Sequence, residues 1–169
     1  MSKAACAAIV LAAVVASPAA AHVTLERRQA PVGSYYKAVF AVPHGCAGSP
    51  TVKLRVQVPE GVIGIKPMPK AGWTVETVKG KYATEYDFHG SKLSEGVKEV
   101  VWSGGKLPDH QYDEFVVSTF ITDGMKPNTM LYFPVVQECE QGVSRWIDIP
   151  REGMKAMGMA ASRRRRASS

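Results

Sequence analysis

Apolar and polar residues alternate with a period of two, in short runs, between residues 22 and 150. β-Branched and aromatic residues are enriched in these runs, and clusters of glycine and proline separate them, which is typical of strands joined by turns. We expect strands at 23–25, 35–42, 51–58, 62–65, 73–78, 82–88, 97–102, 115–122, 131–136 and 143–149. Because no long helical stripe accompanies them, the pattern predicts an antiparallel β-sandwich.

Glycine and proline mark the expected turns, which lie at 43–50, 59–61, 67–72, 79–80, 103–105 and 123–124. The alternating region has about 130 residues, which suits one domain with a real core. We expect residues 22–150 to form this single domain. Five aromatic side chains are expected to fill the space between the sheets: Tyr35, Phe40, Trp73, Trp102 and Phe115.

Residues 1–21 have the layout of a secretory signal peptide. Lys3 gives a positive start, residues 4–16 are apolar, and three alanines at 19–21 provide the small-residue pattern that signal peptidase requires. The apolar stretch is shorter than the ~20 residues that span a bilayer. We therefore expect cleavage after Ala21, export to the periplasm or the exterior, and no stable membrane insertion.

Export decides how the cysteines are interpreted. Cys6 lies in the segment that is expected to be lost, which leaves Cys46 and Cys139. An oxidising compartment lets such a pair persist as a disulfide, and a loop approaching a hundred residues is worth roughly 4 kcal/mol in the chain-entropy model. A redox or copper(I) pair is the alternative, but the C-x-x-C spacing is absent. We expect a Cys46–Cys139 disulfide.

The chain carries a net charge of +6, and the excess lies outside the alternating region. Residues 22–150 hold fourteen basic and fourteen acidic side chains, whereas residues 151–169 hold six basic and one acidic. A tail of like charges with few anchoring residues predicts a basic, disordered segment at 151–169. Its arginines could touch anionic lipid and its methionines could offer thioethers to copper(I), with a plain solvated terminus as the simpler interpretation. The neutral domain gives no reason to expect nucleic-acid binding.

His22 would become the first residue after cleavage, and this position gives it two metal donors. A free amino terminus has a pKa of about 8, so it yields its proton to a metal more readily than lysine does. The amine and the ring Nδ1 of one histidine can close a six-membered chelate. Two nitrogens suit tetragonal Cu(II), which stands highest in the divalent affinity order. By composition alone, roughly one chain in forty would begin with histidine by chance.

Several short motifs are spread over nearly all of the region 22–150. They are His-Val-Thr-Leu-Glu at 22–26, Gly-Ser-Tyr at 33–35, Val-Pro-His-Gly-Cys at 42–46, Val-Pro-Glu-Gly-Val-Ile-Gly-Ile-Lys-Pro-Met-Pro-Lys at 58–70, Gly-Trp at 72–73, Asp-Glu-Phe at 113–115 and Arg-Trp-Ile at 145–147. Together they resemble the DUF1775 or YcnI-like family. The spread makes this resemblance more specific than any one motif.

The resemblance implies an exported copper-binding protein with an immunoglobulin-like β-sandwich. In that family the Cu(II) site is a monohistidine brace, in which the N-terminal histidine supplies amine and imidazole, an acidic side chain adds an oxygen, and a tryptophan lies beside the metal. His22 matches the histidine and Trp146 matches the tryptophan. A tryptophan on the last strand is also a common core residue, so both roles stay open for Trp146.

The acidic ligand is the least determined element, and Glu26 is our first choice. Four residues of a straight strand span about 13 Å, so Glu26 and His22 meet one ion only if the segment bends. The glutamate that some relatives carry after the Gly-Ser-Tyr motif is Tyr36 here and is not transferred. The remaining alternatives are Asp113, Glu114 and Asp148.

Three further histidines lie in turn-rich stretches: His44, His89 and His110. We expect each to be solvated, with His44 in a loop held by the disulfide. A second histidine at the site would change the protein's class, because two imidazoles with an open coordination position are what copper monooxygenases use.

These observations predict an exported Cu(II)-binding protein that buffers copper or hands it to a membrane copper transporter or another periplasmic cuproprotein. We expect no enzymatic activity, since the chain lacks a Gly-x-Ser-x-Gly elbow, a His-Glu-x-x-His motif and a phosphate-binding glycine loop. Two alternatives remain. One is a secreted copper-dependent oxidative enzyme, and the other is an adhesion or scaffold module without metal.

Overall fold

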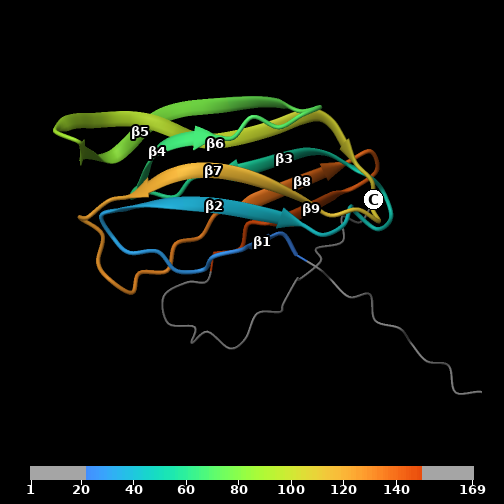
Figure 1. The fold of residues 1–169 in the computed structure, drawn as a ribbon, viewed down its shortest axis with the longest axis horizontal. Coiled ribbons are helices and arrows are strands. Elements are labelled where there is room, and N and C mark those ends of the chain that lie inside the picture. The colour runs from blue at the N-terminus through green and yellow to red at the C-terminus, as the bar shows by residue number, and fades with distance from the viewer. Residues whose placement is uncertain (1–21, 150–169) are drawn as a thin grey trace, which may run out of the picture.

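Two antiparallel sheets face each other in the computed structural model, which describes residues 22–149 (Figure 1). The first sheet has the order β1-β2-β7-β4 and the second the order β5-β6-β3-β8-β9. The strands are β1 (Thr24–Leu25), β2 (Ser34–Val42), β3 (Thr51–Gln57), β4 (Val62–Pro67), β5 (Thr74–Phe88), β6 (Ser91–Leu107), β7 (Asp113–Ile121), β8 (Val135–Cys139) and β9 (Val143–Trp146). The predicted all-β sandwich is confirmed. The predicted signal peptide and basic tail lie outside the described residues.

Alternation along β2 and β7 builds the core side of the first sheet. The inward residues of β2 are Tyr36, Ala38, Phe40 and Val42. Phe40, Trp102 and Phe115 are almost fully buried, as predicted, and Trp73 lies half-buried against Phe115 with 5.0 Å between ring centroids. The prediction for Tyr35 is wrong, since its side chain is 61% exposed. Tyr36 takes the inward place, and neighbouring residues of a strand point to opposite faces.

The predicted turns at 79–80 and 103–105 are also wrong, because β5 and β6 form one long hairpin that runs through both. Gly80 pairs with Gly96 inside the ladder. A Cβ on Gly96 would lie 1.7 Å from the Tyr82 hydroxyl, and a Cβ on Gly105 would lie 2.2 Å from the Trp73 ring. These two glycines therefore make room for aromatic rings within a strand. The two strands predicted at 73–78 and 82–88 are a single strand with irregular register between its halves.

The end of the chain also differs from the prediction. The strand expected at 131–136 is β8, which begins only after Pro134, a residue that has no N–H for a ladder. The last strand, β9, ends at Trp146 rather than at residue 149. Among residues 22–149 there is no helix with the length and apolar character to cross a membrane.

The predicted disulfide between Cys46 and Cys139 is confirmed, with the two Cα atoms 5.9 Å apart. Cys46 lies in the loop that leaves β2 for β3, and Cys139 ends β8. The same loop also holds the β8–β9 turn through main-chain groups, since the N–H of Glu140 donates to the carbonyl of Pro50 at 3.0 Å. The disulfide therefore joins a loop from the first sheet to a strand of the second.

Candidate metal centre

The imidazole of His22 lies beside the indole of Trp146. Their ring centroids are 6.1 Å apart and their planes are inclined at 58°. Both side chains are half-buried, and Trp146 packs against the core cluster. Of the residues proposed for the metal site from the sequence, these two are the pair that the structure brings together.

The two rings meet because each belongs to the edge of a different sheet. His22 comes two residues before β1, which within residues 22–149 pairs only with β2, through Thr24 opposite Ala41 and Leu25 opposite Phe40. Trp146 ends β9, whose one partner among the described strands is β8. Figure 1 shows β1 and β9 on the same side of the sandwich. The pair therefore lies at the side of the sandwich where the edge strands β1 and β9 meet.

Glu26 follows β1 and is exposed. Its N–H donates to the carbonyl of Val39 at 3.1 Å, so the chain continues along β2 through this residue. The carboxylate makes no hydrogen bond or ion pair within residues 22–149. Among the described residues, Glu26 thus offers an oxygen donor that no hydrogen bond or ion pair occupies.

Tyr36 fixes the chain just beyond Glu26, because its hydroxyl donates to the carbonyl of Arg27. The pKa of the Tyr36 phenol is raised above its ordinary value. Burial is the main cause, the Glu26 carboxylate adds to it, and the Arg27 guanidinium opposes it. The place after the Gly-Ser-Tyr motif therefore holds a buried phenol that anchors the N-terminal segment, and this phenol stays protonated.

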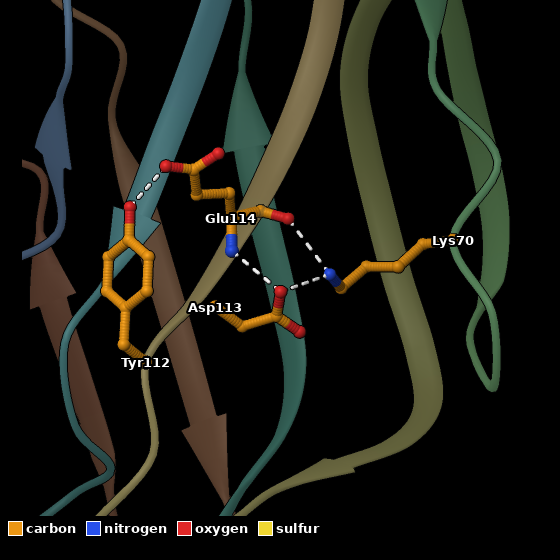
Figure 2. Close-up of polar contacts among 4 residues, drawn as sticks. All are labelled: Lys70, Tyr112, Asp113 and Glu114. Atoms are coloured by element: carbon orange, nitrogen blue, oxygen red, sulfur yellow. Dashed lines mark hydrogen bonds and ion pairs between the residues drawn. The ribbon is translucent and has the colours of Figure 1, made fainter.

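Asp113 and Glu114 open β7 and are held by contacts of their own (Figure 2). Lys70 Nζ donates to Asp113 Oδ1 at 2.6 Å and to the carbonyl of Glu114 at 2.9 Å. The same ammonium lies 4.7 Å from the centre of the Phe115 ring. Only 14% of the Lys70 side chain is exposed, and its positive charge balances the negative charge of the Asp113 carboxylate. Asp113 is thereby committed to a structural ion pair.

Tyr112 engages the other carboxylate, since its hydroxyl donates to Glu114, as Figure 2 shows. This hydrogen bond raises the pKa of Tyr112 to about 12, with smaller contributions from burial and from the charges of Glu114, Glu26 and Asp113. Sequence reasoning missed both Lys70 and Tyr112. Lys70 lies in a proline-rich turn and reaches Asp113 from 43 positions away in the chain, so no local pattern marks it.

The other histidines lie away from the ring pair. His44 Nδ1 donates to the neighbouring carbonyl of Gly45 at 2.5 Å, in the disulfide loop as expected. His89 is exposed, yet it shares a hydrogen bond of 2.9 Å with the Tyr35 hydroxyl and stacks on that ring. His110 is exposed.

No cluster of three or more His, Cys, Asp or Glu side chains within residues 22–149 is arranged to hold a metal ion. A monohistidine brace needs fewer, because one residue supplies two nitrogens and one carboxylate supplies the oxygen. A search for clusters of three such side chains therefore does not test for a brace.

A model of the family described as a domain of unknown function, DUF1775, matches residues 22–163. The chain belongs to the DUF1775 family. Its fold is similar to the crystal structure of an uncharacterized protein from Nocardia farcinica that is described as having an immunoglobulin-like fold. The two chains are 26% identical, the match covers 77% of this chain and 86% of the other, and the TM-score is 0.54. No curated protein matches the chain. The DUF1775 domain of this chain thus has the immunoglobulin-like sandwich expected from the sequence.

Proposed function

We propose that this DUF1775 protein is an exported Cu(II)-binding protein without enzymatic activity, which buffers copper or hands it to a membrane transporter or another periplasmic cuproprotein. The observation that carries the proposal is the approach of the His22 and Trp146 rings from the edges of two different sheets. Export and cleavage after Ala21 are part of the proposal, because they create the free amine of His22.

The donor set fits Cu(II) as cargo. The amine and Nδ1 of His22 would supply two nitrogens from one residue, and imidazole donors suit copper well. Trp146 is not a usual metal ligand. In this role its indole would cover one face of the ion and limit the access of water and oxidants.

The oxygen ligand in this proposal is Glu26, whose carboxylate has no hydrogen bond or ion pair in the part of the chain that the structure describes. Binding would then require the segment before β1 to fold back, since the ladder through Glu26 is extended. Asp148 is the competing donor, because it is exposed and comes two residues after Trp146, at the same edge of the second sheet. Asp113 is the weakest of the remaining candidates because Lys70 already binds it.

An open edge with few protein ligands also fits transfer. A partner can replace the ligands one at a time when only one residue and one carboxylate hold the ion. No second histidine contributes to the ring pair among the described residues, so the arrangement favours carriage of copper over the two-imidazole chemistry of an oxidative enzyme.

Titration of the mature protein with Cu(II), followed by tryptophan fluorescence, tests the proposal. We expect quenching that saturates at one equivalent, persists in Trp73→Phe and is largely lost in Trp146→Phe and in His22→Ala. Glu26→Gln and Asp148→Asn, compared under the same conditions, identify the oxygen ligand as the position where the affinity falls. Quenching that is unchanged in His22→Ala would exclude the brace.

A further inference from the structure

The two rings of the candidate site are placed by strands that each have one neighbour within residues 22–149. β1 follows His22 and is hydrogen-bonded to β2 alone, and β9 carries Trp146 and is hydrogen-bonded to β8 alone. The separation of the two rings therefore depends on how β2 lies relative to β8. These two strands belong to different sheets and share no ladder.

A set of contacts connects the end of β8 to the loop that leaves β2. The disulfide joins Cys46 of this loop to Cys139 at the end of β8. Gln137 of β8 is 1% exposed, and its Nε2 donates to the carbonyl of His44 at 2.8 Å and to the hydroxyl of Thr51 at 2.6 Å. Because both N–H groups of this buried amide have acceptors, the amide fixes β8 relative to the loop and to the start of β3.

The turn between β8 and β9 rests on the same loop. The N–H of Gln141 donates to the Ser49 hydroxyl at 2.8 Å, and the N–H of Glu140 donates to the carbonyl of Pro50 at 3.0 Å. The β8–β9 hairpin is thus fixed at its turn to the segment that follows β2. Trp146 lies at the other end of this short hairpin, three residues beyond the first residue of β9.

We propose that the Cys46–Cys139 disulfide is a positioning element of the His22–Trp146 pair, because it joins the loop that follows β2 to β8, and β2 and β8 are the strands on which β1 and β9 pair. The inference rests on the proposed function for its effect on Cu(II) affinity. The effect on the ring pair itself does not need the metal.

The experiment compares Cys46→Ala/Cys139→Ala with Ile63→Ala in the mature protein. Ile63 is fully buried in β4, at the edge of the first sheet opposite β1, so its truncation destabilises the sandwich far from the rings. Alanines at both cysteine positions avoid free thiols, which would bind or reduce copper. Thermal unfolding of both variants fixes a temperature at which each is folded.

Two readouts separate positioning from general stability. We expect the disulfide variant to bind Cu(II) about tenfold more weakly, the size of effect typical of groups that orient metal ligands, while Ile63→Ala keeps the affinity of the original chain. We also expect the nuclear Overhauser contact between the His22 and Trp146 rings to be lost without the disulfide and kept in Ile63→Ala, with no metal present.

Equal weakening in the two variants would overturn the inference, because it would reduce the disulfide to a contribution to stability. An unchanged ring contact in the disulfide variant would overturn it as well. His22→Ala in the same titration keeps the two claims apart. If the original chain binds Cu(II) and His22→Ala does not, the proposed function stands. A disulfide variant with unchanged affinity would then refute only the positioning role of the disulfide. If the original chain binds no Cu(II), the proposed function falls, and the ring contact still decides the positioning of the pair.

Discussion

Replacing Lys70 with methionine should destabilise the protein by about 3 kcal/mol. Within residues 22–149 the Lys70 ammonium makes three contacts: an ion pair with Asp113, a hydrogen bond to the carbonyl of Glu114 and a cation–π contact with Phe115. An exposed ion pair is worth about 0.2–1 kcal/mol and a hydrogen bond to a charged group about 1.5–3 kcal/mol. Because Lys70 is 14% and Asp113 is 36% exposed, we place their coupling between these limits, at about 1–1.5 kcal/mol. The hydrogen bond from the ammonium to the Glu114 carbonyl adds about 1.5 kcal/mol, the low end of that range, and the ring contact adds about 0.5 kcal/mol.

Methionine keeps the apolar length of the lysine stem, so the loss reports the ammonium rather than a cavity. Urea unfolding of Lys70→Met, Asp113→Asn and the double variant gives the coupling energy from a double-mutant cycle. Lys66→Met is the matched control, since Lys66 is an exposed lysine of β4, four residues before Lys70. It should change stability by less than about 0.5 kcal/mol.

A coupling energy below about 0.3 kcal/mol would refute the reasoning, because the pair would then behave as a fully exposed one. The result also bears on the metal centre. If Asp113 is committed to Lys70, Asp113→Asn should leave the Cu(II) affinity unchanged, and a loss of affinity would restore Asp113 as a candidate ligand.

Three further predictions concern charge and covalent structure. Phenol absorbance should show one tyrosine titrating near pH 12, absent in Tyr112→Phe and shifted toward the ordinary range in Glu114→Gln, because the hydrogen bond to Glu114 raises that pKa. Burial acts to raise the pKa of the Glu60 carboxyl, but hydrogen bonds from Lys98 and Tyr86 outweigh the effect of burial, so the pKa lies below its ordinary value. Glu60 therefore stabilises the fold at a pH above its pKa in the unfolded chain, and this stabilisation is lost as the pH falls through its pKa in the folded protein. Glu60→Gln should make the free energy of unfolding fall less steeply at acid pH. An unchanged dependence on acid pH would contradict this. Removing the disulfide should cost about 4 kcal/mol in urea unfolding, given a sequence separation of 93, and a loss below about 1 kcal/mol would contradict the chain-entropy account.

The fold could be predicted from the sequence because apolar and polar residues alternate along the strands, and the structure buries the apolar ones. Phe40 and Phe115 fall on the inner face by period two, and both are buried. The errors come from residues whose role depends on the opposite strand. Gly80 and Gly105 look like turn residues locally, but they lie within strands. Gly105 lacks a side chain because the Trp73 ring lies against it.

Two residues of the candidate metal site could be named from the sequence. His22 follows from the expected cleavage site, and the resemblance singled out Trp146, which the structure places beside it. The carboxylate could not be chosen from the sequence, because that choice depends on which acids already have partners. Lys70 reaches Asp113 across 43 positions of the chain, and only the packed loop reveals that contact.

The most direct test of the account is electron paramagnetic resonance of the mature protein with one equivalent of Cu(II), compared with a variant that carries one extra alanine before His22. The extra residue leaves the imidazole in place and converts the amine of His22 into an amide. We predict a tetragonal Cu(II) signal with nitrogen hyperfine structure in the mature protein, and its loss in the extended variant. The same signal with the same affinity in both proteins would contradict the central claim that the free amine of His22 binds the metal.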